Sequence, residues 1–97
     1  MFNLMVSGKI TAISEPHALP SGVVVVHVTI TAKVFNGEVY GDWPMHIRCT
    51  DRLFDRMERF LTVGKYIGVS AYTMYYIDGH VPGELDLVLA ANDLWIL

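Results

Sequence analysis

The order of the predicted elements constrains the fold of this chain more than any other feature of its sequence. Three stretches with strand-like alternation come first, one short amphipathic helix follows, and two further strands come last. In 97 residues, expected to form one domain over 1–97, this order predicts an all-β fold with one helix. The specific expectation is a five-stranded Greek-key barrel of the OB type, with the helix between strands three and four. The strands are expected over residues 2–13, 23–35, 43–49, 65–77 and 85–97, and the helix over residues 53–61.

Alternation along the strands assigns the side chains to two faces. In the first strand Phe2, Leu4, Val6 and Ile10 are expected to point inward. Gly8 interrupts this strand and is expected to mark a bulge or a sharp bend, which a small barrel needs in order to close. The inner sets expected in the later strands are Val28, Ile30, Ala32 and Val34; Met45, Ile47 and Cys49; and Ile67, Val69, Ala71, Thr73 and Tyr75.

Turn and cap residues mark the connections between these elements. Residues 14–22 are expected to form a loop, and Asn36-Gly37 is expected to form a two-residue hairpin turn of type I′. Thr50 or Asp51 is expected to cap the N-terminus of the helix, and Gly64 to end it as the glycine after its last turn. Breaks in the third strand are expected at Gly41, Asp42 and Pro44, and a kink in the fifth at Asn92-Asp93.

The balance of apolar and charged residues predicts an oligomer. Hydrophobic residues make up 53% of the chain and charged residues 18%. A domain of this size has too little interior for so many apolar groups, so some apolar surface is expected to be shared between subunits. The net charge of −3 argues mildly against a nucleic-acid partner. However, five of the seven Lys and Arg residues lie within residues 33–59, which is compatible with one basic face.

The sequence contains no arrangement typical of catalysis, of a metal site or of another cofactor. The four His residues lack metal-ligand spacing, and Cys49 is expected to be a buried thiol rather than a nucleophile. The chain is therefore expected not to be an enzyme. It has one cysteine, no apolar run long enough to span a membrane and no secretory leader, which favours a soluble cytoplasmic protein.

Several segments, taken in order, resemble the DNA-binding domain of bacterial single-stranded DNA-binding proteins. Residues 2–10 (FNLMVSGKI) resemble the first strand of that family, with its asparagine and central glycine, and residues 27–32 (HVTITA) resemble the second. Residues 43–49 (WPMHIRC) stand where the family has a tryptophan-led third strand. Residues 53–69 resemble its helix, turn glycine and fourth strand. The resemblance covers nearly the whole chain. It implies an OB barrel that binds single-stranded DNA with little sequence preference, in DNA replication, repair or recombination.

The resemblance also implies which aromatic side chains hold the strand. Family members stack bases on a few aromatic rings, and the corresponding positions fall at or near Phe35, Trp43 and Tyr76. Tyr72 lies four residues before Tyr76 and is expected on the same face. Thr50 stands where the family has another aromatic residue, so one stacking position is missing.

Three side chains on neighbouring strands are expected to contact the phosphates. Lys33, His46 and Arg48 alternate outward and are expected to neutralise phosphate charge. The residues also allow other roles. These three can be ordinary solvated surface groups, the outward aromatic rings can face a second subunit, and Trp43 can fold over the rim of the barrel.

The expected partner is single-stranded DNA, with RNA left open, and the expected assembly is a homodimer or a homotetramer. Members of the family usually carry a disordered tail with an acidic end that recruits other proteins, whereas this sequence stops directly after its last strand. Tail-less relatives include the primosomal replication protein PriB, which implies an alternative role as a bridge between DNA and a helicase. An OB barrel used only for protein–protein assembly is the other alternative.

Overall fold

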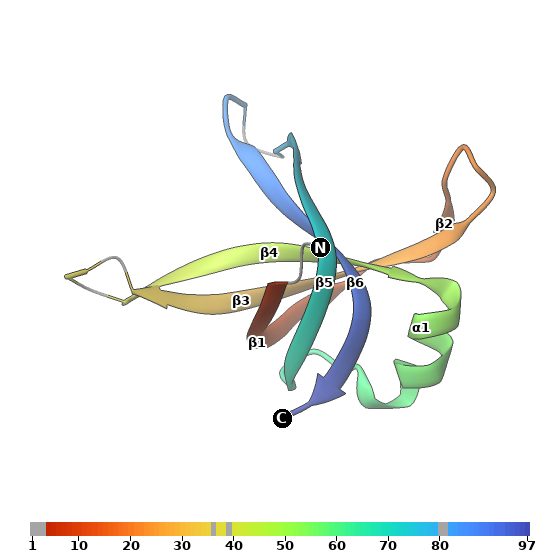
Figure 1. The fold of residues 1–97 in the computed structure, drawn as a ribbon, viewed down its shortest axis with the longest axis horizontal. Coiled ribbons are helices and arrows are strands. Elements are labelled where there is room, and N and C mark those ends of the chain that lie inside the picture. Colours follow the sequence, from red (N-terminus) through yellow and green to blue (C-terminus); the bar gives the residue numbers. More distant parts are fainter. Residues whose placement is uncertain (1–3, 36, 39, 80–81) are drawn as a thin grey trace.

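The computed structural model describes residues 4–35, 37–38, 40–79 and 82–97, which form a six-stranded sheet curled into a barrel, with one short helix (Figure 1). The strand order is β1-β5-β6-β4-β3-β2, and a further ladder between β1 and β3 closes the barrel. The predicted OB barrel, with five long strands and a helix between the third and fourth of these, is confirmed. The elements are β1 (Leu4–Ile13), β2 (His17–Ala18), β3 (Val24–Phe35), β4 (Tyr40–Thr50), α1 (Asp51–Met57), the 3₁₀ helix η1 (Glu58–Phe60), β5 (Tyr66–Asp78) and β6 (Leu85–Ile96).

The barrel closes because β1 pairs with two strands in turn. Residues 4–9 pair with β5, and residues 9–13 pair with β3. Gly8 lies beside this change of partner, and a Cβ atom there would lie 2.7 Å from the backbone oxygen of Thr31. Gly8 therefore permits the close approach of β1 and β3. The irregularity that was expected at Gly8 falls at Thr11, which the β1–β3 register skips.

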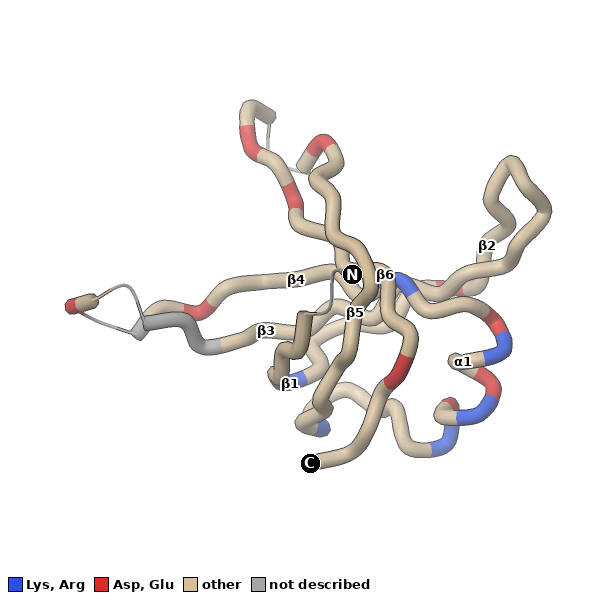
Figure 2. Tube along the Cα trace, viewed as in Figure 1, with Lys and Arg blue, Asp and Glu red and all other residues tan. Residues whose placement is uncertain are grey.

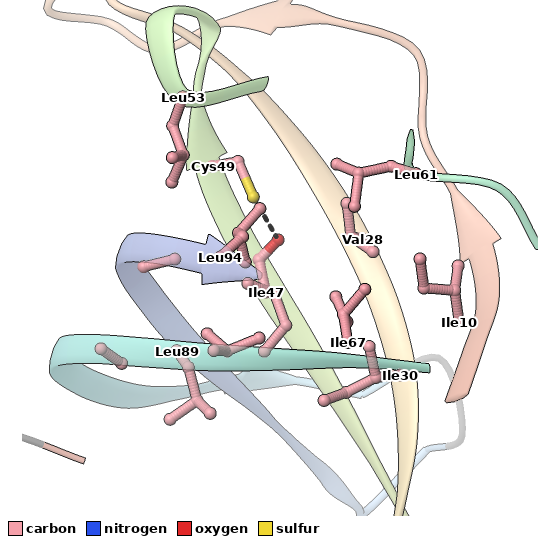
Figure 3. Packing of buried hydrophobic residues seen from close by; sticks show 13 residues of the cluster. Ile10, Val28, Ile30, Ile47, Cys49, Leu53, Leu61, Ile67, Leu89 and Leu94 are labelled. Atoms are coloured by element: carbon pink, nitrogen blue, oxygen red, sulfur yellow. Dashed lines mark hydrogen bonds between the residues drawn. The ribbon is translucent and has the colours of Figure 1, made fainter. Parts of the chain in front are cut away.

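Side chains from every long strand fill the core (Figure 3). Burying one large aliphatic side chain contributes roughly 1.5–3 kcal/mol. The predicted inward positions of β1, β3 and β4 and the first half of β5 are confirmed, apart from Phe2 and Val34, whose side chains lie outside the described part. The core cluster consists of Ile10, Val28, Ile30, Ile47, Cys49, Leu53, Leu61, Ile67, Val69, Ala71, Leu89, Ala91 and Leu94.

The helix covers one end of the barrel, where α1 packs against β3, β4 and β6 (Figure 1). Thr50 caps it as predicted, because its hydroxyl oxygen accepts a hydrogen bond from the backbone N–H of Leu53 at 3.5 Å. Leu53, on α1, and Leu61, directly after η1, both reach the core. No helix among the described residues has the length and apolar character needed to cross a membrane.

Gly64 does not end the helix, which corrects the prediction. The helical segment stops at Phe60, and Leu61 already has an extended backbone with φ −93° and ψ 95°. Gly64 lies further on, in the turn before β5, with a φ of +98° that favours glycine. Its N–H donates to the backbone oxygen of Ile10 at 2.9 Å, so this glycine ties the turn to β1.

Two connections differ from their predictions. Residues 14–22 are not only a loop, because β2 pairs with the start of β3 and forms a small hairpin. At the other end of β3, Phe35 pairs with Tyr40, so four residues connect β3 and β4 instead of two. Asn36, the first residue of the predicted turn, lies outside the described residues.

The predicted breaks at Gly41, Asp42 and Pro44 are wrong, since all three lie inside β4. Pro44 pairs with Thr31 of β3. On the other edge of β4, the ladder with β6 begins at His46. A proline has no backbone N–H to donate and is tolerated at such a half-paired position.

The β5–β6 ladder contains one skipped residue on each strand. On β5 the register passes from Ala71 to Thr73 and skips Tyr72, and on β6 it skips Asn92. The kink predicted at Asn92-Asp93 is therefore confirmed. The matching irregularity at Tyr72 was not predicted.

The skipped Tyr72 reverses the faces of the second half of β5. Met74 pairs with Leu89, which is fully buried, so Met74 and Tyr76 share the core-facing side of the ladder. Thr73 and Tyr75 consequently lie on the outer side. The prediction that Thr73 and Tyr75 continue the inner set is wrong, because a one-residue slip moves every later side chain to the other face. The prediction that Tyr76 lies on the outer face is wrong for the same reason.

Cys49 is expected to resist thiol reagents while the protein is folded. Its side chain is fully buried, and burial raises the pKa of the thiol from 9.0 to about 12. The thiolate is the reactive species, so labelling at pH 8 should be slow until denaturant is added. Rapid labelling of the folded protein would contradict this.

The same shift makes stability depend on pH in the alkaline range. A raised pKa in the folded state favours the neutral thiol. Below pH 9 the buried neutral thiol therefore makes its full contribution to the free energy of unfolding. It is lost as the pH rises toward 12. Denaturant unfolding of the wild type and of Cys49→Ala across this range checks the prediction, since the variant should lack this part of the decline.

Candidate functional site

Two hairpins extend past the barrel, and the space where they diverge forms the candidate site. β3 and β4 stay paired to Phe35 and Tyr40, while β5 and β6 stay paired to Asp78 and Leu85. β4 and β6 meet in a short parallel ladder over residues 46–48. Beyond this ladder the two hairpins project in different directions (Figure 1).

A groove of about 380 Å³ lies between the two hairpins. It brings together Trp43 of β4 and Tyr76 of β5, two of the predicted stacking residues. Their side chains are 52% and 59% exposed, so both rings are available to a ligand. The groove is lined by Trp43, Pro44, Tyr76, Glu84, Leu85, Asp86 and Leu87, and is called the hairpin groove below.

Both rings reach this groove because each lies on the face of its strand that points toward the core further along the strand. Trp43 pairs with Ala32, a buried residue on the inner side of β3. Tyr76 pairs with Leu87, which packs against the core cluster. Without the skipped Tyr72, alternation would place Tyr76 on the opposite side of β5. The bulge is therefore what brings Tyr76 to the same groove as Trp43.

His46 and Arg48 lie together on the outer face of β4. His46 is held by two partners: its Nδ1 is 3.0 Å from the hydroxyl of Thr29, and its Nε2 is 3.2 Å from a carboxylate oxygen of Asp86. Both ring nitrogens of His46 are thus engaged, so the predicted phosphate contact is better suited to Arg48. The guanidinium of Arg48 lies 5.3 Å from the ring centre of Tyr75, a cation–π contact.

Two further histidines extend this outer face toward β2. His27 lies opposite Arg48 in the β3–β4 ladder, and its ring meets the ring of His17 edge-on at 5.0 Å between centres. Burial lowers the pKa of His27 below 6.5, and the neighbouring His17, His46 and Arg48 lower it further. Among the described residues, no group of three or more His, Cys, Asp and Glu side chains is placed to hold a metal ion.

Of the remaining predicted residues, Tyr72 does not line the hairpin groove. Tyr72 is half-exposed at the bulge of β5. Lys33 and Phe35 belong to β3 and pair with Asp42 and Tyr40, but their side chains lie outside the described part of the structure.

Four residues of the site were not predicted from the sequence, for three different reasons. Tyr75 was assigned to the core because nothing in the run of alternating residues signals the bulge before it. Asp86 holds His46 across two strands that are far apart in the sequence, a contact that no local pattern reveals. Leu85 and Leu87 were predicted only as part of a strand, and they line the hairpin groove because β4 and β6 diverge there.

The charges of the described residues are unevenly distributed (Figure 2). Basic and acidic residues alternate along α1 and η1, while acidic residues lie on both projecting hairpins. The carboxylates near the hairpin groove favour placing the uncharged part of a ligand there and its anionic groups elsewhere. The acidic residues of the hairpins are Glu38, Asp42, Asp78, Glu84 and Asp86, and the basic residues of the helical segment are Arg52, Arg56 and Arg59.

Solved structures share this architecture over essentially the whole chain. PriB of Ralstonia solanacearum is 12% identical with a TM-score of 0.72, covering 100% of this chain and 99% of that one. The SSB of Plasmodium falciparum, solved in complex with single-stranded DNA, is 17% identical with a TM-score of 0.70, covering 100% and 95%. The single-stranded DNA-binding protein of Thermus aquaticus is 16% identical with a TM-score of 0.71, covering 98% of this chain and 49% of that one.

The fold is that of the SSB and PriB proteins. This chain spans about half the length of the Thermus aquaticus protein that it matches. No protein-family model matches the sequence, and neither does any curated protein. At 12–17% identity, the likeness to these three structures establishes the OB fold, while the function has to be argued from the site.

Proposed function

We propose that this protein binds single-stranded DNA with little sequence preference and that its activity is binding rather than catalysis. The hairpin groove carries the proposal, because Trp43, Tyr76, Leu85 and Leu87 all line it and both rings are exposed. Every base has a π-face, so two exposed rings suit a ligand made of successive bases. The shared fold with an SSB solved in complex with single-stranded DNA supports the same reading.

The charges suggest how the strand runs. Glu84 and Asp86 line the hairpin groove and disfavour phosphates there, so the bases enter and the phosphates face outward. Arg48, which lies on β4 outside the lining of the groove, is the proposed phosphate contact, with Lys33 as the second. With few cations involved, the affinity should fall only gently as salt is added.

The proposed active form is a homo-oligomer. Exposed apolar side chains away from the hairpin groove include Met5, Tyr66 and Leu97, which are 57–65% exposed. Such residues suit a subunit interface. In a dimer or tetramer, sites of about 4–16 nucleotides each would act on one strand and strengthen its binding through effective concentration.

Titration with oligodeoxythymidylates of increasing length tests the function. Trp43 should report binding as saturable quenching of tryptophan fluorescence, and the length dependence should give the site size. Oligouridylate in the same assay separates DNA from RNA preference. If no quenching and no gel shift occur with micromolar protein at low salt, single-stranded DNA binding is refuted.

A second candidate is a PriB-like or purely protein-binding role, favoured by the five acidic residues on the two hairpins. Such surfaces attract basic protein segments more readily than nucleic acid. A purely protein-binding role predicts concentration-dependent association on a sizing column without quenching by oligodeoxythymidylate, whereas a PriB-like role predicts quenching together with a separate contact to a helicase. The purely protein-binding role would become the favoured function if the DNA titration showed no binding.

A further inference from the structure

The outer face next to the hairpin groove carries a compact group of cationic and titratable side chains. His17 of β2 meets His27 of β3 edge-on, and His27 lies opposite Arg48 of β4. Tyr75 of β5 lies against Arg48 on the far side. Four strands thus contribute side chains to one patch, which is called the His27 patch below.

His27 and His46 differ in what holds their rings. Both ring nitrogens of His46 are engaged, by Thr29 and by Asp86. The ring of His27 meets the ring of His17, while its backbone N–H donates to the hydroxyl of Ser14 at 2.9 Å and its backbone oxygen accepts from the N–H of Ser14 at 2.9 Å. The ring of His27 is therefore able to donate to a ligand once it is protonated.

The charges around His27 come from three directions. β2 contributes His17, and β4 contributes Arg48 and His46, each of which lowers the pKa of His27 after the larger effect of burial. β6 contributes Asp86, whose carboxylate is bound to His46. His17, His46 and Arg48 thus all disfavour the protonated form of His27, while the carboxylate of Asp86 is engaged by His46. An anion beside His27 would be attracted by the permanent charge of Arg48 and would favour the protonated ring.

We propose that His17, His27 and Arg48 form a subsite for a phosphodiester group of the bound strand, and that His27 takes up a proton when the phosphate binds. The inference rests on the proposed function and deepens it, because it places the phosphates of a strand whose bases lie in the hairpin groove. Arg48 supplies the permanent charge, and His27 supplies charge that depends on pH.

Proton uptake by His27 predicts the direction in which pH changes the affinity for the strand. A phosphate beside His27 raises the pKa of that ring, which is depressed in the free protein. Affinity for the strand therefore increases as the pH falls through the histidine range. For one linked proton the gain is at most about tenfold per pH unit.

The coupling between protonation and DNA binding is tested with Cy3-labelled dodecathymidylate. Its binding is followed by fluorescence anisotropy between pH 5.5 and 8. The wild type should bind several-fold more tightly at the acid end. His27→Gln should lose most of this pH dependence, and Arg48→Gln should bind more weakly at every pH. Arg56→Gln is the matched control, because Arg56 lies on α1 and pairs with Asp93 at 2.9 Å. If His27→Gln keeps the full pH dependence, the proposal is wrong.

Nuclear magnetic resonance of the histidine ring protons separates this proposal from the proposed function. Inorganic pyrophosphate should raise the midpoint of the His27 titration. If pyrophosphate does so while no oligonucleotide binds, the anion subsite stands and the DNA-binding function fails. If dodecathymidylate binds but the His27 titration does not move, DNA binding stands and the subsite is refuted.

Discussion

Replacing Trp43 with alanine should weaken the binding of oligodeoxythymidylate by about five- to 150-fold, which corresponds to the loss of one stacked base at roughly 1–3 kcal/mol. The effect should be large because the indole is half-exposed and lines the hairpin groove, where Tyr76 is the other exposed ring. Anisotropy of a labelled oligonucleotide measures the loss without depending on the removed fluorophore.

The same substitution should leave the melting temperature almost unchanged. Trp43 lies on the projecting part of β4, outside the core cluster. Phe60→Ala is the matched control, since Phe60 is 44% exposed on η1 and takes no part in the groove. Equal loss of affinity in Phe60→Ala, or full affinity in Trp43→Ala, would refute the assignment of the site.

Tyr76 should act together with Trp43. Tyr76→Ala alone should also weaken binding, and the double variant should lose less than the sum of the two free-energy changes if one strand contacts both rings. Fully additive losses would indicate that the two rings act independently.

Replacing Gly8 with valine should lower the free energy of unfolding by about 1–3 kcal/mol or more. A Cβ atom at this position would lie 2.7 Å from the backbone oxygen of Thr31, and backbone at the closing ladder of the barrel cannot move aside cheaply. For a domain of this size, each kcal/mol corresponds to roughly 4–8 °C in melting temperature.

Gly41→Val provides the matched control for Gly8→Val. Gly41 also lies in a strand, but no atom lies within 4 Å of the Cβ position and its backbone requires no positive φ. Thermal unfolding followed by circular dichroism should therefore show a clear loss for Gly8→Val and little change for Gly41→Val. Similar melting temperatures for both variants would show that the contact between β1 and β3 is looser than described.

The fold was predictable because alternation and turn residues are local signals. The inner residues of β3 and β4 follow strict alternation, and the apolar stripe that includes Leu53 and Leu61 placed the helix between strands. Pro44 was misleading, because a proline weakens a strand prediction unless it is known that one edge of the strand lacks a ladder there.

The site was predictable only in part. The resemblance placed Trp43 and Tyr76 on stacking positions, but their meeting in one groove depends on the splay of two hairpins and on the bulge at Tyr72. Three tyrosines within five residues of β5 look equally suited to either face, so the sequence could not show which of them turns outward. The roles of Lys33, Phe35 and Tyr72 stay predictions.

The separation between the projecting hairpins and the core has a practical consequence for protein engineering. The outer halves of β3–β4 and β5–β6 carry the proposed recognition residues but contribute little to the interior. Segments of this kind can be exchanged, shortened or diversified at small thermodynamic cost. A library randomised at Trp43, Tyr76 and Leu85 should therefore keep the barrel folded while sampling new ligands.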